Sequence, residues 1–411
     1  MANDWVTSRE AARRLGISAA TLYAYVSRGL LRSEAVDGSR ERRYRADDIS
    51  RLKRRREVGR KAESIANHAL DFGTPVLESA LTLIEDGHLY YRGVDATELA
   101  RTASLEDVAR LLWECDDKPF AVDNLPPLTT ALRRAWLAAA TLGPVDRCLV
   151  LLPAAAALDH PSWVEDRAAM LETGVRVLRL LTAAVTARPP STLAVHQQLA
   201  AAWRVPPEHA PLLRAALVLS ADHEFNASTF AARVTAATLS DVHSGVVSGI
   251  GALKGPLHGG ANEQVMLMVQ KIRDPAKADA WIRQALADKA RIMGFGHRVY
   301  RVEDPRAKHL KRLALELGQQ AGSTVNIQIL DIMAGVVSAA KHIFPNVDLY
   351  SGAAYASMGI STDQFTPIFA MSRVAGWAAH ILEQHGNNRL IRPRSDYTGA
   401  TDAKYVPLAE R

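Results

Sequence analysis

Residues 293–306 read MGFGHRVYRVEDPR, a stretch that sets His297 and several arginines among glycines and a proline. Glycine allows the backbone to approach a ligand closely, so His297 stands where a small molecule can be held. Polar residues occur in similar settings in four further stretches: DHEFNAST (222–229), GPLHGGAN (255–262), PNVDLYSG (345–352) and AMSRVAG (370–376). The five stretches together supply three histidines, an aspartate and several arginines, the side chains required for acid–base chemistry on a small polyanion.

The segments around these stretches are expected to be helical. Apolar residues recur every three or four positions, the period of one helix face, in 105–113, 129–142, 167–185, 210–219 and 265–272. Alternating patterns are scarce, apart from a short hairpin expected at Gly87–Gly93. Residues 62–411 are therefore predicted to be almost entirely α-helical.

The composition is that of a large soluble protein. Of the 411 residues, 48% are hydrophobic and 23% are charged, enough for two or three domains. No apolar run reaches 18 residues, and charges stand where a secretory signal would need an apolar block. The two cysteines, Cys115 and Cys148, cannot form a disulfide framework. We therefore expect a cytoplasmic protein with no membrane partner.

The positive charge is concentrated at the front of the chain. Residues 1–61 hold 16 Lys and Arg against 8 Asp and Glu, a net charge of +8, whereas the remainder carries a net charge of −2. Such a local asymmetry indicates a separate module with a polyanionic partner.

This front module is predicted to be a helix-turn-helix with a wing. Thr7 or Ser8 caps a first helix, with Glu10 at the capping-box spacing, and Gly16 ends it. A second helix follows over 18–27, and Asp37-Gly38 is a hairpin turn. A further helix is expected to begin at Asp47 or Asp48.

The order of these elements over residues 4–58 resembles the winged helix-turn-helix domains of the MerR and excisionase group. The resemblance implies that the second helix enters the major groove of double-stranded DNA while the wing touches phosphates. The candidate DNA contacts are Ser18, Thr21, Tyr23, Arg28, Arg40, Arg42 and Arg43. The alternative is a dimerisation or docking module whose charges are merely solvated.

In the second half, arginines accompany the histidines: Arg298, Arg301, Arg306, Arg373, Arg392 and Arg394. Guanidinium groups grip carboxylates with two hydrogen bonds, so a site with several of them suits a dicarboxylate. The alternatives are structural, because a single histidine in a helical protein is more often a core or surface residue. Arg298 and Arg301 also have acidic neighbours in Glu303 and Asp304. No HExxH or CxxC spacing is present, and no metal site is expected.

Six motifs, taken in order, resemble those of citrate synthases: DHEFNAST, GPLHGGANEQV, MGFGHRVYRVEDPRAKHL, NVDLYSGAAYASMGI, FTPIFAMSRVAGWAAHILEQ and LIRPRSDYTG. The segment GHLYYRGVDATELARTASLEDVARLLW (87–113) resembles an earlier part of the same family, so the likeness covers residues 70–400. It implies a mainly α, two-domain fold behind the winged helix-turn-helix domain at 1–60. The large domain would comprise 61–260 and 366–411, and the small domain 261–365.

The resemblance also implies roles. Asp348 matches the base that takes a proton from the methyl group of the acyl-CoA thioester, and His258 matches the histidine that hydrogen-bonds the thioester carbonyl. His297 matches the histidine that polarises the keto group of oxaloacetate. The other residues implied to bind oxaloacetate are His223, Arg306, Arg373 and Arg392, the last contributed by a neighbouring subunit. Arg301 and Arg298 fall where CoA is bound.

The activity implied is the condensation of acetyl-CoA with oxaloacetate and water to give citrate and CoA, in a homodimer or larger homo-oligomer without a cofactor. Propionyl-CoA, giving 2-methylcitrate, is an open alternative, because one methylene in an apolar pocket changes discrimination by only about 1–3 kcal/mol. A second alternative, of another class, is a DNA-binding regulator that senses oxaloacetate or acyl-CoA without turning it over.

Overall fold

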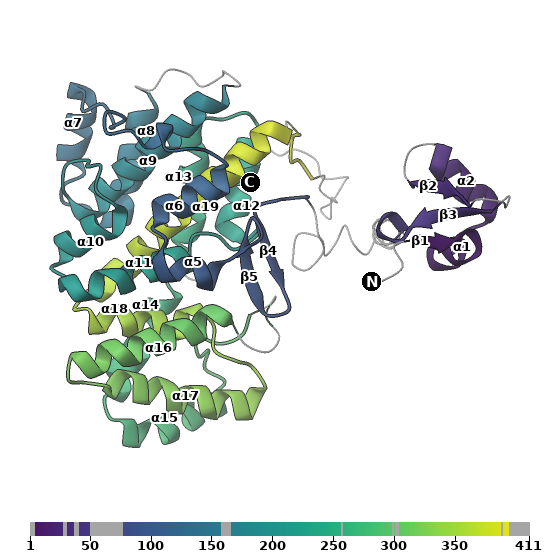
Figure 1. Cartoon of the computed structure of the whole chain (residues 1–411). Coiled ribbons are helices and arrows are strands. Elements are labelled where there is room, and N and C mark those ends of the chain that lie inside the picture. The colour runs from purple at the N-terminus through teal and green to yellow at the C-terminus, as the bar shows by residue number, and fades with distance from the viewer. Residues whose placement is uncertain are drawn as a thin grey trace, which may run out of the picture. The chain divides into compact units, whose positions relative to one another are not determined.

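The computed structural model describes residues 5–27, 31–36, 41–49, 77–157, 166–255, 258–297, 300, 304–387 and 389–393. The chain divides into two compact units, Met1–Glu78 and Ser79–Arg411. The helices and strands are drawn in Figure 1.

The first unit contains β1 (Trp5–Thr7), α1 (Ser8–Leu15), α2 (Ala19–Ser27), β2 (Ser33–Ala35) and β3 (Arg42–Arg45). The strands form one antiparallel sheet in the order β1-β3-β2. As predicted, Thr7 caps α1 by accepting a hydrogen bond from the Glu10 amide, and Gly16 ends the helix with a φ of 60°. The chain turns helical again at 46–49, close to the predicted start. The predicted turn at Asp37-Gly38 lies outside the described residues.

The core of the first unit is small. Leu15, Leu22, Leu31, Tyr44 and Ile49 bury their side chains together with Ala11. These residues come from both helices, the sheet and the start of the last helix, so the helix-turn-helix and the wing share one core.

The second unit opens with a three-stranded sheet of order β4-β5-β6, formed by β4 (Thr82–Glu85), β5 (His88–Tyr91) and β6 (Val94–Asp95). Asp86 and Gly87 both have positive φ, 51° and 79°, as a tight hairpin turn requires. The hairpin expected at 87–93 is therefore displaced toward the N-terminus. Its first strand, β4, precedes residue 87, its turn is Asp86-Gly87, and only its second strand, β5, lies within the expected range. The alternating pattern was visible only in the second strand.

The rest of the second unit is helical, as predicted. Its elements are α5 (Ala96–Thr102), α6 (Leu105–Trp113), η1 (Lys118–Phe120), α7 (Thr130–Ala138), α8 (Pro144–Ala156), α9 (Arg167–Thr186), α10 (Val195–Trp203), η2 (Pro207–His209), α11 (Ala210–Leu219), α12 (Ala227–Ala236), α13 (Val242–Leu253), α14 (Ala261–Ile272), α15 (Pro275–Ala287), α16 (Pro305–Gln320), α17 (Val325–Lys341), α18 (Val347–Ser357), η3 (Thr362–Gln364) and α19 (Phe365–Asn387).

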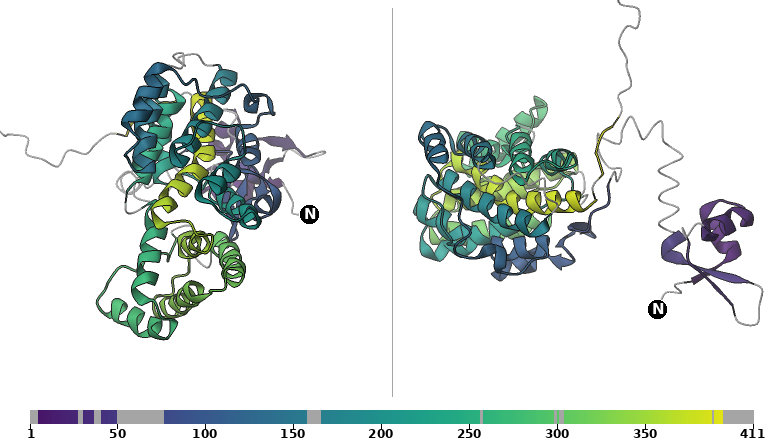
Figure 2. Two further views of the ribbon diagram at one scale, coloured as in Figure 1. Left: turned by 90° about the vertical axis from the view of Figure 1, so that its left-hand side faces the viewer. Right: turned by 90° about the horizontal axis from the view of Figure 1, so that it is seen from above.

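Helix α19 organises this unit. It packs against α6, α9, α12 and α13, and its residues from Phe365 to Gln384 are mostly buried. In Figures 1 and 2 it runs as the yellow helix among the teal and blue helices, while α15, α16, α17 and α18 gather at one end. A residue in the middle of α19 is therefore surrounded on all sides.

None of the helices in the described part of the chain has the length and apolar character needed to cross a membrane.

Candidate active site

The predicted site residues come from six separate places in the second unit, one of which is the segment between α15 and α16 that carries His297. His223 lies in the loop between α11 and α12, and His258 stands before α14. Arg306 and Asp348 occupy the first turns of α16 and α18, and Arg373 lies in the middle of α19. The contacts below join them into one cluster.

His223 and His297 lie edge to face, with ring centroids 4.8 Å apart. Tyr300 joins them, because its hydroxyl is 3.2 Å from His223 Nε2 and its ring centroid is 4.8 Å from that of His297. Burial, reinforced by the positive charge of Arg306, lowers the pKa of His297 to about 4 and that of His223 well below its usual range. Both rings are therefore neutral at pH 7.

The segment with His297 is tied to the segment that leads into α18. The Gly296 amide donates to Phe344 O at 2.8 Å, and Asn346 donates from its side chain to Gly296 O at 3.1 Å. Gly294 has a φ of 86°, and a Cβ there would lie 2.9 Å from side-chain carbons of Leu349 and Val265. A glycine is therefore required for this close approach, which brings His297 toward Asp348.

Arg306 is buried and held by Asp304, the residue that caps α16. Its Nε and Nη2 donate to the two oxygens of Asp304 at 3.0 and 2.8 Å. Burial alone would lower the pKa of Arg306, but the charge of Asp304 more than offsets it and raises the pKa above its usual range. Asp304 Oδ2 also accepts from the Val347 amide at 3.0 Å, which fixes the start of α18 beside this ion pair.

Arg373 is the opposite case, a buried guanidinium with open hydrogen-bonding positions. It is only 2% exposed, yet Nε and Nη1 have no hydrogen-bond partner. Burial lowers its pKa to about 10, with the charge of Asp222 opposing the shift. A buried charge that lacks partners is costly, so this guanidinium is suited to receive an anion.

Burial raises the pKa of Asp348 to about 6, although Arg306 and Arg373 act in the opposite direction. The carboxyl group is thus more basic than an ordinary aspartate, yet still ionised at pH 7. Its position at the start of α18 is fixed by Asn346, whose side chain accepts from the Asp348 amide at 3.0 Å.

His258 Nε2 lies 2.8 Å from Ser228 Oγ. The same hydroxyl group accepts from Trp377 Nε1 at 3.2 Å and donates to Asn226 Oδ1 at 2.8 Å. Burial, with a contribution from Arg373, lowers the pKa of His258 to about 4, so this ring is also neutral at pH 7.

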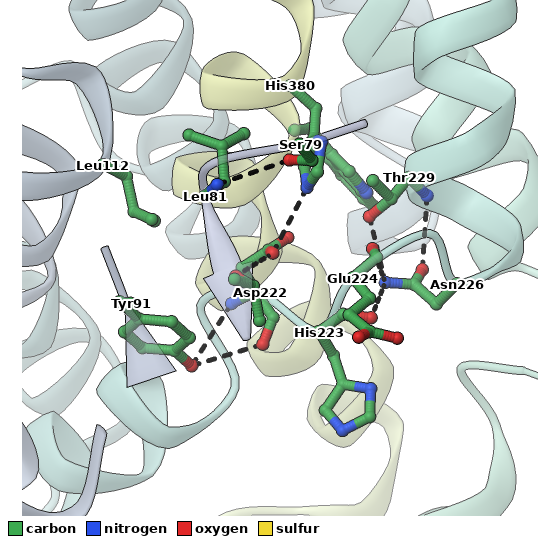
Figure 3. Close-up of polar contacts among 12 residues, drawn as sticks. Ser79, Leu81, Tyr91, Leu112, Asp222, His223, Glu224, Asn226, Thr229 and His380 are labelled. Atoms are coloured by element: carbon green, nitrogen blue, oxygen red, sulfur yellow. Dashed lines mark hydrogen bonds and ion pairs between the residues drawn. The ribbon is translucent and has the colours of Figure 1, made fainter. Parts of the chain in front are cut away.

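The loop that carries His223 rests on a buried polar network, shown in Figure 3. Asp222 Oδ2 accepts from Thr82 Oγ1 at 2.5 Å and from His380 at 3.2 Å. Tyr91 Oη donates to Val218 O at 3.0 Å and lies 3.3 Å from the Asp222 amide and carbonyl groups.

The structure thus brings together His223, His258, His297, Arg306, Asp348 and Arg373. It does not place Arg392 with them, because Arg392 is exposed after the end of α19. Arg298 and Arg301, the predicted CoA ligands, lie outside the described residues. The residues that sequence reasoning missed are Ser228, Asp222, Tyr300, Asp304 and His380. All five lie inside the quoted motifs, and a closer reading of those motifs could have found the first four, whereas nothing in FTPIFAMSRVAGWAAHILEQ distinguished His380 from an ordinary core residue.

Of the predicted DNA contacts in the first unit, Tyr23, Arg42 and Arg43 are exposed. Ser18 Oγ accepts from the Thr21 amide at 3.2 Å, which caps the start of α2, and lies 2.9 Å from Thr21 Oγ1. Arg28 and Arg40 lie outside the described residues. In the described part of the chain, no group of three or more His, Cys, Asp and Glu side chains is arranged to hold a metal ion.

A mainly helical fold that gathers two buried arginines, three neutral histidines and a carboxylate of raised pKa defines an enzyme acting on a carboxylate-rich small molecule. The chain belongs to the citrate synthase family, since the model of the citrate synthase C-terminal domain matches residues 70–394. It is an acyltransferase of the citrate synthase type. Residues 6–58 match the model of the MerR HTH family regulatory proteins.

Individual relatives agree. Citrate synthase 2 of Bacillus subtilis is 39% identical over 367 residues, covering 82% of this chain and 98% of that protein. A 2-methylcitrate synthase of Mycobacterium tuberculosis is 38% identical over 335 residues, covering 76% and 84%. The structure of a ternary complex of carboxymethyl coenzyme A and oxaloacetate with the citrate synthase of Thermoplasma acidophilum is 30% identical, covers 84% and 99%, and has a TM-score of 0.73. The predicted family, fold class and helix-turn-helix are therefore confirmed.

Proposed function

We propose that the enzyme condenses acetyl-CoA with oxaloacetate and water to give citrate and CoA, with no cofactor. The observation that carries this proposal is the presence in one cluster of Arg373, which is buried with open donors, and Asp348, a partly buried carboxylate whose pKa is raised to about 6. The first suits a dicarboxylate, and the second suits proton abstraction from carbon.

Asp348 takes a proton from the methyl group of the thioester, and the electrons move to the carbonyl oxygen. A methyl group beside a thioester is a weak acid, so this oxygen needs a hydrogen-bond donor as charge develops on it. His258 supplies the donor. The ring is neutral at pH 7, because burial lowers its pKa to about 4. Its N–H can therefore donate a hydrogen bond to the enolate oxygen as a neutral imidazole rather than as a charged imidazolium.

The donor role requires the proton of His258 to be on Nδ1. In the structure the Ser228 hydroxyl donates to Asn226 Oδ1 at 2.8 Å, so the contact with His258 at 2.8 Å is made by a proton on Nε2, which donates to Ser228 Oγ. Trp377 Nε1 also donates to this hydroxyl oxygen. The donor role therefore requires the ring to exchange to the other tautomer, with its proton on Nδ1 and the Ser228 hydroxyl turned toward Nε2.

His297 hydrogen-bonds the keto oxygen of oxaloacetate and draws electrons from the carbon that the enol attacks. His223, Arg306 and Arg373 bind the two carboxylates. As the new carbon–carbon bond forms, the keto oxygen becomes a hydroxyl by taking up one proton, which balances the proton that Asp348 removed from the methyl group. Water then hydrolyses the thioester and releases CoA as the thiol. We propose Arg298 and Arg301 as ligands of the CoA phosphates.

The proposed assembly is a homodimer or larger homo-oligomer, in which Arg392 of each subunit completes the oxaloacetate site of a neighbour. This is supported by its exposure beyond α19, away from the cluster. We further propose that 261–365 forms a small domain that closes over the large domain of 61–260 and 366–411 and excludes water. The two free cysteines are compatible with a cytoplasmic location.

The test is the release of CoA thiol from oxaloacetate plus either acetyl-CoA or propionyl-CoA. The proposal expects turnover with a higher kcat/KM for acetyl-CoA. A higher value for propionyl-CoA would assign the chain to the 2-methylcitrate synthases, a class also found among its relatives. Release from neither thioester would favour the non-catalytic regulator.

The pH dependence follows from Asp348. A base must be deprotonated, so kcat/KM is expected to fall about tenfold per pH unit below the pKa of about 6. The three histidines should not change kcat/KM between pH 7 and 5, because their pKa values lie at about 4 or well below the usual range and the rings stay neutral there. Initial rates measured from pH 5 to 8 check this; a rate independent of pH in that range would contradict Asp348 as the base.

We propose in addition that the first unit binds double-stranded DNA. The support is its charge, the MerR family match, and the exposed Arg42 and Arg43 on β3. The binding constant for DNA falls as the salt concentration rises. If these arginines contact phosphates, the full chain carrying Arg42→Ala and Arg43→Ala should show a slope of log binding constant against log salt that is less steep by about 2. Gel shifts of a duplex at several salt concentrations measure this, and binding that ignores salt would favour a docking module.

A further inference from the structure

The proposed chemistry makes no use of Asp222, although this carboxylate is completely buried beside His223. Its Oδ2 accepts two hydrogen bonds, from Thr82 Oγ1 and His380 Nε2, as Figure 3 shows for the His380 bond. Its Oδ1 accepts none. A buried carboxylate with an empty oxygen requires an explanation, since leaving it unpaired is costly.

Asp222 lies against the face of α19 that carries Arg373. It touches the helix at Gly376, where an added Cβ would overlap Asp222 Oδ1 and come within 2.5 Å of Ala221 O. Gly376 is three residues after Arg373 and four before His380, spacings that put all three on one helix face. The carboxylate is therefore flanked by a guanidinium on one side and an imidazole on the other.

The direction of the bond from His380 is fixed by its other neighbour. His380 Nδ1 lies 3.1 Å from Arg233 Nη1, and a guanidinium can only donate. Nδ1 must therefore accept, so the proton of the neutral ring is on Nε2 and is donated to Asp222. Arg233 is itself held by Glu383 and, at 2.9 Å, by Gln384 Oε1.

Without these restraints, a buried carboxylate so close to a buried guanidinium would form a two-pronged ion pair with it. Arg373 shows no such pair, because its Nε and Nη1 remain open. The counter-charge is thus near enough to stabilise the guanidinium but is held away from the hydrogen-bonding positions that the substrate needs.

We propose that His380 is a positioning residue that restrains Asp222, so that Arg373 stays open for the substrate and the loop carrying His223 stays fixed on α19. The proposal rests on the proposed function, because it assigns Arg373 and His223 to the carboxylates of oxaloacetate. A purely structural role for His380 would instead affect stability alone.

The test compares His380→Leu with His380→Gln in the full chain. Leucine cannot donate to Asp222, so the KM for oxaloacetate should rise about 10- to 100-fold, while the KM for acetyl-CoA changes little. Glutamine has both a donor and an acceptor and should restore most of the affinity. The matched control is Thr182→Val, which removes a buried 2.8 Å hydrogen bond to Leu178 O within α9 and should leave both KM values unchanged.

A lower melting temperature for His380→Leu with an unchanged KM for oxaloacetate would overturn the proposal, as would an equal rise in the control. If His380→Leu does not fold, Thr82→Val removes the other donor to Asp222 with little change in shape, and an unchanged KM in that variant would likewise overturn the proposal. Calorimetry of the wild-type chain with oxaloacetate separates the two failures. Wild-type protein that neither binds oxaloacetate nor releases CoA overturns the proposed function and this inference with it, whereas active wild type with unaffected variants overturns the inference alone.

Discussion

Asp348→Asn is expected to lower the rate of CoA release by about 10²- to 10⁴-fold, because asparagine has nearly the same shape but cannot accept the proton. Binding of oxaloacetate, measured by calorimetry, should be retained, since Arg306 and Arg373 are untouched. The fold should not be weakened, because the substitution replaces a partly buried carboxyl group with a neutral amide of nearly the same shape.

Asp331→Asn is the matched control for this variant. Asp331 accepts from Tyr350 Oη at 2.9 Å, so it also contacts α18, but it is half-exposed and lies on α17. Its turnover should remain at the wild-type level. Full activity in Asp348→Asn would remove Asp348 from the proposed chemistry.

Arg373→Met is expected to raise the KM for oxaloacetate by about 100-fold, since truncating one partner of a buried charge pair costs about 2–5 kcal/mol. The same change should alter the stability of the substrate-free enzyme little, because it removes a buried charge whose Nε and Nη1 have no partners. Oxaloacetate should raise the melting temperature of the wild type but not that of the variant.

Arg147→Met should behave in the reverse manner. Arg147 is also buried, but it donates to Ala184 O at 2.6 Å and to Leu142 O at 3.0 Å. Its loss leaves two carbonyl groups without a donor and should lower the melting temperature, with the KM for oxaloacetate unchanged. If both variants lose stability equally and keep the wild-type KM, Arg373 is a structural residue.

Local features of the fold were predictable from the sequence. Helices α6 and α11 have the predicted ends, and Thr7 caps α1 as its spacing from Glu10 indicated. Helix α7 ends at Ala138, four residues before the predicted end, because the apolar period continued into residues that the backbone leaves as a turn. Such patterns report which face of a segment is apolar, and they locate its ends less well.

The site was predictable only in part. The motifs supplied the histidines, the arginines and Asp348, because each of these lies in a recognisable stretch. The restraint on Asp222 was not predictable: His380 lies in the same motif as Arg373, but nothing in that motif indicates that its ring reaches a carboxylate 158 residues away. Nor did the motifs indicate that Arg306 would donate to Asp304 whereas Nε and Nη1 of Arg373 would have no hydrogen-bond partner. This difference depends on the side chains that the fold packs around each guanidinium.

The network around Asp222 also bears on how the two parts of the chain can be separated or exchanged. Its most N-terminal members are Ala80, whose amide donates to Glu383 at 2.8 Å, and Thr82. Both belong to the first few residues of the second unit. A chain cut before Ser79 keeps both bonds, whereas one cut four residues later loses them and, with them, a restraint on the substrate loop. Under the proposal for His380, the residues just after the boundary between the two units support the substrate loop, so any exchange of front ends must keep the chain from Ser79 onward.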